Sequence, residues 1–448
     1  GLGACTPATP PILPLLRAIS PAVGPTAGGT AITIEGENFA PGATLSFAGI
    51  TAQEVTVVGP GRITAKLPAN PGAWGPIAVQ VQNPDGNIGS NSDLFHYFSS
   101  SVTFAAQPAV ATANDPRGGT LADFNRDGYD DVVFAAYRSP YSNSKVSVHL
   151  GDGKGGFGPA KTYWVNGLPC CIAVADFNRD GALDMAVSNQ QTGDISVLIG
   201  NGQGMFQDPV HIKVGVNPSH IVAGDFNSDQ KIDLIVNDQR DRSQNLLFGD
   251  GNGNFAAPTK LPESANGYVL EVADWNGDSR LDLAVANGWT AYANGVGVLT
   301  GDGKAGFDGP LQLSVSPSPH MILGRDLDGD RRPELIALSD TDAGFLVMLN
   351  DGRGSFDLPL HYGLATSCYW GEVADLNGDT LPDLLITINS GIVIYPGIGK
   401  GRLGTPIPLA IEESISSAAI GDLDGDKRPD LVIGLGTGQA MVFLNQSR

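Results

Sequence analysis

"DFNRDGALD", residues 176–184, places Asp176, Asn178, Asp180 and Asp184 at positions 1, 3, 5 and 9 of a short segment, with Gly181 at position 6. Variants of this segment recur seven times, beginning at Asp123, Asp176, Asp225, Asp274, Asp326, Asp375 and Asp422. Successive starts lie 53, 49, 49, 52, 49 and 47 residues apart. A repeat with a period near 50 residues is the signature of a propeller or a solenoid.

Each unit contains the same order of apolar and turn segments. In the second unit, strand A is "IAVAD" (172–176), strand B is "LDMAVSN" (183–189) and strand C is "ISVLIG" (195–200). A Gly-rich hairpin, "GNGQGMF" (200–206), leads into strand D, "DPVHIKV" (208–214). Four antiparallel strands in about 50 residues make one propeller blade. Seven units therefore predict a seven-bladed β-propeller over residues 99–448.

The two ends of the repeat region predict how the ring closes. The last unit ends after its strand C, "AMVFLN" (440–445), while an additional strand D, "SVTFAAQPAVA" (101–111), precedes the first acidic segment. The N-terminal propeller strand is expected to complete the last blade, because this 3+1 arrangement removes both open sheet edges.

Residues 17–98 lack the acidic segment and alternate between strand-like and Gly- or Pro-rich stretches. At "ISPAVGPTAGGTAITIEGENF" (19–39), "VQVQNPDG" (79–86) and "DLFHY" (93–97), the chain resembles the IPT/TIG family. This resemblance implies an immunoglobulin-like β-sandwich that serves as a spacer or stalk. The predicted fold class of the whole chain is therefore all-β.

Residues 1–16 form a Pro-rich tail before this domain. "LGAC", ending at Cys5, resembles the lipobox of bacterial lipoproteins, which implies a lipid anchor at Cys5. The alternative is an ordinary unpaired cysteine in an extended tail.

The segments "DFNRDGYDD" (123–131) and "GDGKGGFGP" (151–159) resemble the FG-GAP/VCBS repeats of integrin α-chain-like propellers and of related bacterial surface proteins and lectins. The resemblance covers residues 101–448. It implies calcium in the loop between strands A and B of each blade.

The residues themselves also favour calcium, which takes six to eight hard oxygen ligands. An EF-hand is excluded because position 12 of the second segment is Val187 and strands flank the loop. We predict up to seven calcium ions, held by Asp123, Asn125, Asp127, Asp131, Asp176, Asn178, Asp180, Asp184, Asp225, Asn227, Asp229, Asp233, Asp274, Asn276, Asp278, Asp282, Asp326, Asp328, Asp330, Glu334, Asp375, Asn377, Asp379, Asp383, Asp422, Asp424, Asp426 and Asp430.

Charge repulsion supports the metal prediction. The ligand positions include 23 of the 47 acidic residues. Two carboxylates about 5 Å apart repel by roughly 3 kcal/mol at an effective dielectric constant of 20. The alternative is that some loops are Asx-turns without an ion. The loop at Asp225 is the weakest candidate, because Gln230 occupies position 6 and no glycine stands at position 4.

The composition excludes several classes of function. A formal net charge of −21 with only 26 Lys and Arg argues against nucleic-acid binding. No apolar run approaches 18 residues, so no membrane-spanning helix is expected. The apolar residue at position 2 of each acidic segment is expected to pack between blades.

The ligand-binding face is expected opposite the calcium loops, where strands A begin. Residues that lie five to seven positions before each acidic segment form this rim. Together with two of the loops between strands B and C, they predict that aromatic side chains gather in one sector of the ring. Its residues are His220, Tyr268, Trp289, Tyr292, His320, Tyr369 and Trp370. Aromatic rings beside polar groups suit sugars. The alternatives are a plugged channel, a copper or zinc site using His220, His320 and the cysteines, and a vicinal disulfide between Cys170 and Cys171.

These features predict an extracellular or cell-surface, calcium-stabilised recognition or adhesion protein that binds a glycan or another protein. One alternative is a polysaccharide-active enzyme of the lyase or dehydratase type, with a base such as His220, His320 or Tyr268; Arg, which such an enzyme needs to neutralise a carboxylate, is sparse near the rim. Another alternative is a structural subunit of a cell-surface assembly.

Overall fold

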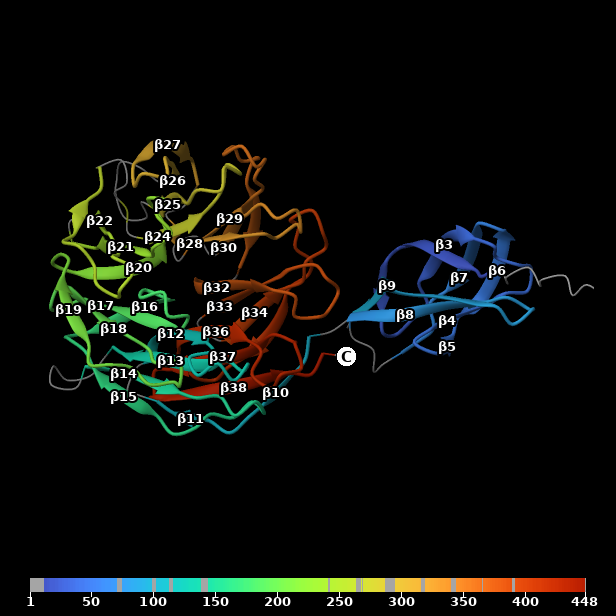
Figure 1. The fold of residues 1–448 in the computed structure, drawn as a ribbon, viewed down its shortest axis with the longest axis horizontal. Coiled ribbons are helices and arrows are strands. Elements are labelled where there is room, and N and C mark those ends of the chain that lie inside the picture. Colours follow the sequence, from blue (N-terminus) through green and yellow to red (C-terminus); the bar gives the residue numbers. More distant parts are fainter. Residues whose placement is uncertain are drawn as a thin grey trace, which may run out of the picture. The chain divides into compact units, whose positions relative to one another are not determined.

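The computed structural model describes residues 12–70, 75–98, 102–112, 116–137, 144–240, 242–262, 267, 269–286, 295–315, 319–339, 344–364, 366–388 and 391–447. The chain forms two compact units, and the larger contains Phe104–Ala374 and Leu381–Asn445 (Figure 1). All regular elements in the described ranges are strands, and none of the described residues belong to a helix capable of crossing a bilayer. Cys5 lies outside the described residues, as do Tyr268, Trp289 and Tyr292.

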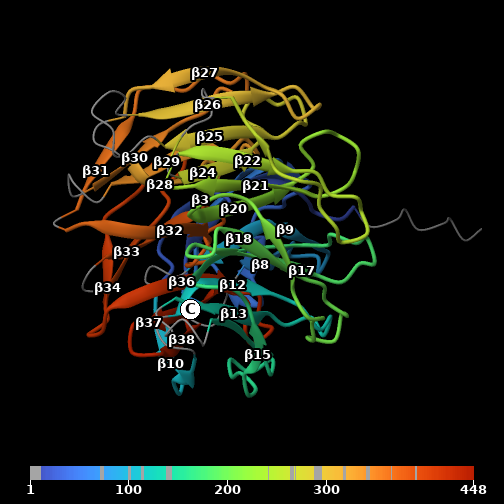
Figure 2. The ribbon, with the colours of Figure 1, turned by 90° about the vertical axis from the view of Figure 1, so that its left-hand side faces the viewer.

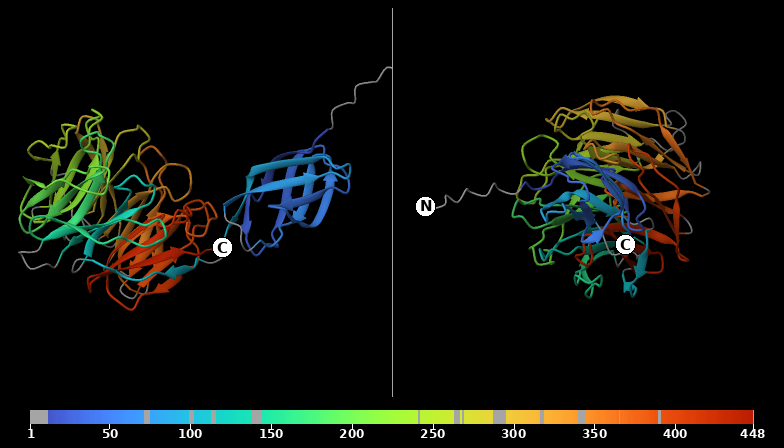
Figure 3. Two further views of the ribbon diagram at one scale, coloured as in Figure 1. Left: turned by 60° about the horizontal axis from the view of Figure 1, so that its bottom comes forward. Right: turned by 90° about the vertical axis from the view of Figure 1, so that its right-hand side faces the viewer.

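The N-terminal unit is a sandwich of two sheets (Figure 3). One sheet has the order β1 (Leu15–Ser20), β3 (Ala31–Glu37), β7 (Arg62–Lys66) and β6 (Gln53–Gly59). The other has the order β2 (Val23–Pro25), β9 (Ile88–Phe98), β8 (Gly75–Gln82), β4 (Thr44–Phe47) and β5 (Ile50–Thr51). Ile34 and Ile63 of the first sheet share one buried core with Phe47, Val79 and Phe95 of the second. The immunoglobulin-like sandwich is confirmed.

Seven sheets built on the 50-residue units follow in the described part of the chain. The first two contain β12 (Pro116–Ala122), β13 (Asp131–Ala136), β14 (Lys145–His149), β15 (Lys161–Trp164), and β16 (Pro169–Ala175), β17 (Asp184–Asn189), β18 (Asp194–Leu198), β19 (Val210–Lys213). The third and fourth contain β20 (Pro218–Gly224), β21 (Asp233–Asp238), β22 (Ser243–Leu247), β23 (Thr259–Lys260), and β24 (Val269–Ala273), β25 (Asp282–Ala286), β26 (Val296–Gly301), β27 (Phe307–Leu313).

The fifth and sixth sheets contain β28 (Pro319–Arg325), β29 (Glu334–Ser339), β30 (Gly344–Met348), β31 (Leu360–Gly363), and β32 (Cys368–Ala374), β33 (Asp383–Ile388), β34 (Gly391–Tyr395), β35 (Ile407–Ala410). The seventh contains β36 (Ile415–Gly421), β37 (Asp430–Leu435) and β38 (Gln439–Asn445). Strands A of the seven sheets surround the centre of the ring (Figure 1). Strands B, C and D follow outward in order, as β24 to β27 show in Figure 2.

The seventh sheet is completed by the start of the propeller chain. Strands β10 (Phe104–Ala106) and β11 (Val110–Ala111) both pair antiparallel with β38. A backbone hydrogen bond of 3.1 Å from the Gly155 N–H to the Leu423 carbonyl joins the first sheet to the seventh. The equivalent bonds between other neighbouring sheets measure 2.9–3.2 Å. The expected 3+1 closure is confirmed.

Burial explains the strand order within a blade. Strand B is buried on both faces in the first three sheets, since every residue of β13, β17 and β21 is buried. Strand D faces solvent, as the largely exposed β15 and β19 show. Strand B has a near-continuous apolar sequence and is buried between its neighbours, whereas the more polar strand D lies at the outer edge of the blade.

Position 2 of each acidic loop joins neighbouring blades, as expected. Phe124 and Phe177 are each 1% exposed. The Phe124 ring meets Phe206 in the hairpin of the next blade at 5.3 Å between centroids, and Phe177 meets Phe255 in the same way. The Phe124 carbonyl also accepts a hydrogen bond from the N–H of Gly204 in that hairpin. The same backbone hydrogen bond fixes five of the acidic loops to the following blade, those that begin at Asp123, Asp176, Asp225, Asp274 and Asp422.

Candidate functional site

The acidic loops share one hydrogen-bond pattern, which the second loop illustrates. The two carboxylate oxygens of Asp176 accept the N–H groups of Asp180 and Gly181, at 3.1 and 2.8 Å. The Asn178 side-chain oxygen also accepts the Asp180 N–H, at 3.0 Å, and Asp180 accepts the N–H of Ala182, at 2.7 Å. The loop thus turns oxygens at positions 1, 3 and 5 toward its own interior.

The position-9 carboxylate joins the acidic loop to the end of strand C. Asp184 is fully buried, and its two oxygens accept the N–H groups of Phe177 and Gly200, at 2.8 and 2.7 Å. Equivalent pairs of hydrogen bonds are made by Asp131, Asp233, Asp282 and Asp430. The position-9 carboxylate therefore connects two segments of the blade by hydrogen bonds, and it is also a candidate metal ligand.

Two residues of each loop adopt the left-handed backbone conformation. They stand at positions 4 and 6: Arg126 and Gly128, Arg179 and Gly181, Ser228 and Gln230, Gly277 and Ser279, Gly329 and Arg331, Gly378 and Thr380, Gly425 and Lys427. Six loops place glycine at one of the two positions. The loop at Asp225 has glycine at neither, so Ser228 and Gln230 both carry the steric cost of a side chain there.

Two loops bring three carboxylates together. Asp326, Asp328 and Glu334 have oxygens within 4.8 Å of one another, and so do those of Asp422, Asp424 and Asp430. Both sets offer only hard oxygen donors, the chemistry that calcium prefers. The other five loops carry asparagine at position 3, so their sets combine carboxylates with an amide oxygen.

Basic residues at position 7 were not anticipated from the sequence. Arg280 pairs with Asp278 at 2.5 Å, and Lys231 pairs with Asp229 at 3.2 Å. Arg332 and Arg428 make the same contact with the position-5 carboxylates of their own loops. In these four loops, a cation bound at position 5 would share the carboxylate with a basic side chain.

Burial raises the pKa of the position-9 carboxyl groups in six loops, and the neighbouring carboxylates of the same loop raise it further; the six groups are Asp131, Asp184, Asp233, Asp282, Glu334 and Asp430. The pKa reaches about 6 for Asp131, Asp233 and Asp282. It reaches about 7 for Glu334 and Asp430. In the absence of a cation, these ionised carboxylates therefore destabilise the folded state at neutral pH.

This predicts an unusual pH dependence for the metal-free protein. The folded-state pKa values lie above the ordinary value near 4, so the folded state binds more protons than the unfolded state between about pH 4 and 7. Stability is therefore expected to fall as the pH rises through this window. Thermal melts in a chelator at pH 5, 6, 7 and 8 measure the trend, and saturating calcium should abolish it. A melting temperature in chelator that rises with pH would contradict the prediction.

The loop at Asp225 yields a second prediction. Gln230→Gly should stabilise the protein by about 1 kcal/mol, because glycine adopts the left-handed conformation without steric cost. Denaturant unfolding in calcium measures the change. The matched control is Lys231→Gly at the adjacent residue, which does not have a positive φ and should lose stability. Equal effects of the two substitutions would show that relief of backbone strain is not the cause.

The rim opposite the acidic loops is built on irregular strands. The pairing of strands A and B shifts register near the start of β12, β16, β20, β28, β32 and β36. The residues at these bulges include Gly118, Cys170, Cys171, Ser219, His220, His320, Tyr369 and Ser416. A β-bulge redirects side chains, which explains why the repeats differ most at this register.

A cavity of about 460 Å³, here called the rim cavity, opens among these bulges. His220, His320, Tyr369 and Trp370 all line it. The four described residues of the expected aromatic sector therefore share one cavity, and the lining of that cavity comes from six of the seven sheets. The channel is narrow enough that bulges on opposite sides border the same space.

Several lining residues were missed from the sequence. Arg117 lies six residues before Asp123, the same register as Cys170 before Asp176, and it is the one arginine among the described residues that line the cavity. Gln190 and Gln239 each lie fourteen residues after a loop start. Applying these two registers to every repeat would have found all three residues.

The aromatic and imidazole groups of the rim cavity contact one another. The His320 and Tyr369 rings lie 6.2 Å apart, and His320 Nε2 is 3.2 Å from the Tyr369 carbonyl oxygen. Burial, together with the nearby His320, lowers the pKa of His220 to about 4. The His220 imidazole is therefore neutral at physiological pH. Tyr369 is 46% exposed.

Cys170 and Cys171 are free thiols in the structure, so the vicinal disulfide is not formed. The Cys170 sulfur lies 3.3 Å from the Ser188 hydroxyl, in the buried wall of the rim cavity. Cys368 is also buried, and its sulfur lies 3.1 Å from the Ser339 carbonyl oxygen. Among the described residues, the three-ligand groups that could hold a metal are acidic, and none combines histidine with cysteine.

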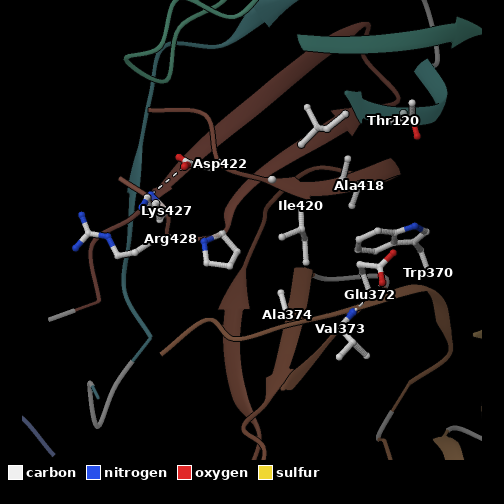
Figure 4. A pocket seen from close by; sticks show the side chains of 15 residues that line it. Thr120, Trp370, Glu372, Val373, Ala374, Ala418, Ile420, Asp422, Lys427 and Arg428 are labelled. Carbon is white, nitrogen blue, oxygen red and sulfur yellow. Dashed lines mark hydrogen bonds between the residues drawn. The ribbon is translucent and has the colours of Figure 1, made fainter. Parts of the chain in front are cut away.

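A second cavity of about 490 Å³, here called the loop-side cavity, leads from Trp370 to the seventh acidic loop. Figure 4 shows Trp370 and Glu372 at one end and Asp422, Lys427 and Arg428 at the other. Trp370 and Ala418 line both cavities, so the two cavities meet along strands A.

An ion-pair cluster lies along the same strands. Arg325 pairs with Glu372 and with Glu271, each at 2.7 Å. The Arg325 side chain therefore joins strands A of three sheets, β24, β28 and β32.

Comparison with known families supports this repeat organisation. The family model described as an FG-GAP-like repeat matches residues 123–187, 176–236, 225–285, 326–386 and 375–433. It therefore finds five repeats where spacing predicted seven, although the five stretches contain all seven acidic loops and cover more than half of the chain. The IPT/TIG domain model matches residues 14–97. No curated protein sequence matches the chain significantly.

Three solved structures are similar to this chain at low sequence identity. A lectin from Agrocybe aegerita, described as recognising non-reducing terminal N-acetylglucosamine, is 15% identical with a TM-score of 0.50, covering 90% of this chain and 98% of the lectin. An auxiliary nutrient binding protein from Bacteroides ovatus is 13% identical with a TM-score of 0.42, covering 98% and 100% of the two chains. A periplasmic gluconolactonase from Pseudomonas aeruginosa is 13% identical with a TM-score of 0.49, covering 83% and 96%.

Proposed function

The chain belongs to the FG-GAP-like repeat family, and we propose that this member is an extracellular recognition protein that binds a glycan in the rim cavity. The single observation that carries the proposal is the chemistry of the rim cavity. Aromatic rings, neutral imidazole and amide or hydroxyl groups line one space of about 460 Å³. That volume falls within the range of small-ligand sites.

Each group has a role in sugar binding. Tyr369 and Trp370 offer apolar faces on which a pyranose ring can stack. Gln190, Gln239 and the neutral His220 offer hydrogen-bond donors and acceptors for ring hydroxyls. A lectin that shares this fold has a sugar ligand by its description, which is compatible with the proposal. The IPT/TIG domain would act as a stalk.

We also propose that calcium occupies the acidic loops. The donor sets fit, because each loop presents oxygen atoms from positions 1, 3 and 9, and two loops present three carboxylates within 4.8 Å. A bound cation would supply the positive charge that these buried carboxylates need. Modules of this kind use calcium at the concentrations found outside cells, which favours an extracellular location.

Removing calcium should destabilise the propeller. We expect a chelator to lower the melting temperature by about 10 °C or more at pH 7.5, because ligands that bind only the folded state add to its stability. Calcium should restore the melt and magnesium should not, since magnesium demands tighter octahedral geometry. Equilibrium dialysis should find seven ions per chain. A measured value of two ions per chain would mean that only the three-carboxylate loops bind calcium. A melting temperature that the chelator leaves unchanged would contradict the proposal.

Truncating the rim aromatics should weaken glycan binding. Tyr369→Ala and Trp370→Ala should each lower affinity about tenfold, because a stacked ring contributes about 1.4 kcal/mol. Trp164→Ala is the matched control: this tryptophan is 59% exposed on the outer strand β15 and should leave binding unchanged. Binding that survives both rim substitutions but is lost in the control would place the site on the outside of the ring.

A polysaccharide-active enzyme is the second candidate. The observation that favours it is the neutral imidazole of His220, which can accept a proton from a substrate in the cavity. Incubation of the calcium-loaded protein with acidic polysaccharides, followed by detection of new unsaturated ends, distinguishes turnover from binding.

A further inference from the structure

His149 is the exception at a strand register that is otherwise apolar or aromatic. It lies on strand C of the first sheet, directly opposite Val132 of strand B. In each of the other six sheets, the residue at this register of strand C is at most 6% exposed. These six residues are Leu198, Leu247, Leu299, Met348, Tyr395 and Phe443. His149 itself is 1% exposed, so the first blade buries an imidazole at this register.

The His149 side chain faces the contact where the ring closes. Val132 and Phe134 of the first sheet share one buried cluster with Val432 and Val442 of the seventh. Residues directly opposite each other in a sheet share a face, so His149 lies on the same face as Val132. Its ring is 6.4 Å from the Phe134 ring, in an edge-to-face arrangement. His149 is therefore packed toward the blade that β10 and β11 complete.

A cavity of about 650 Å³, here called the seam cavity, adjoins His149. One side is lined by residues 107–111, and another by residues 154–160 of the first blade. Residues 104–111, here called the closing segment, pair with β38 only through the three residues of β10 and the two of β11. A short, partly exposed edge beside a cavity opens at a low free energy.

The surroundings of His149 do little to stabilise a positive charge. Neither ring nitrogen has a hydrogen-bond partner of ordinary geometry among the described residues. Burial lowers the pKa of His149, and the Gly158 backbone, which favours the charged form, offsets only part of this effect. Titratable side chains on the surrounding strands and hairpin do not contribute to the shift; they are Asp131, Lys145, Asp152, Lys154, Lys161, Tyr163 and Asp430.

We propose that His149 is an acid-sensitive latch of the ring, whose protonation loosens the contact between the first blade and the closing segment. This inference goes beyond the proposed function and does not depend on the glycan. A histidine exposed to water binds a proton near pH 6.5, whereas the buried His149 binds one only at lower pH. The closed state is therefore fully stable above about pH 6.5 and loses stability as the pH falls below that value.

Thermal melts of the full chain in saturating calcium, at pH 7.5 and pH 5, provide the first test. His149→Leu places at this register the residue that three other blades carry, and His149→Gln keeps a polar side chain that cannot be protonated. Between the two pH values, the wild type should lose about 2 °C more in melting temperature than either variant, as one added proton in a domain of this size implies. All proteins share the acidic loops and His220, so the comparison cancels the contributions of these groups.

His361→Leu is the matched control. His361 is exposed on the outer strand β31 of the fifth blade. This variant should keep the pH dependence of the wild type. If it instead lost the pH dependence as His149→Leu does, the effect would belong to the removal of any histidine, and the latch would be overturned.

Hydrogen–deuterium exchange locates the effect in the fold. At pH 5, amides of β10, β11 and β38 should exchange about tenfold faster in the wild type than in His149→Leu, and this ratio should be smaller at pH 7.5. Amides of the buried strand β21, in the third blade, should exchange alike in both proteins.

Two further results would overturn the inference. The first is an identical pH dependence of the melting temperature in the wild type and both His149 variants. The second is a difference in exchange at pH 5 that is spread evenly over all blades, which would show that His149 affects the whole propeller instead of its closure.

Discussion

The fold depends on a buried carboxylate at position 9 of each acidic loop. In the second blade, Asp184 joins the start of its own loop to the end of strand C through two backbone hydrogen bonds. Phe177, whose N–H donates one of these two hydrogen bonds, also contacts the hairpin of the next blade. One carboxylate therefore supports both the shape of its blade and the contact between blades. Its burial also raises its pKa, so the same group that orders the loop needs a cation or a proton to be stable.

This arrangement separates the two ends of the ring. The acidic loops repeat with little variation because every blade needs the same tie. The opposite rim is free to vary, since a bulge in strand A changes which side chain faces the channel without disturbing the buried strand B beside it. Glycines, cysteines, histidines and aromatic residues consequently occupy one structural position in different blades. Recognition is expected at the end of the ring where the repeats differ.

Much of the fold could be predicted from the sequence, because the strands and turns follow a fixed spacing. The order of strands, the ring closure through β10 and β38 and the buried position-2 residues all came from periodicity and hydrophobic pattern. The rim was harder to predict. Residue order places His220 and Tyr369 in separate blades, but it does not report the width of the channel, and both line one cavity. Arg117 stands at the same register as Cys170, so the repeat spacing could have found it. The pairing of Arg280 with Asp278 depends on side-chain direction, which spacing alone does not give.

The central claim is that cations bind the acidic loops while the ligand binds the opposite rim. A crystal structure of the protein with calcium and a bound oligosaccharide, using long-wavelength anomalous diffraction to locate the ions, tests this division most directly. The account predicts anomalous peaks inside the acidic loops and sugar density against Tyr369 and Trp370 in the rim cavity. Acidic loops without ions, or a sugar coordinated by a calcium ion in one of those loops, would contradict it.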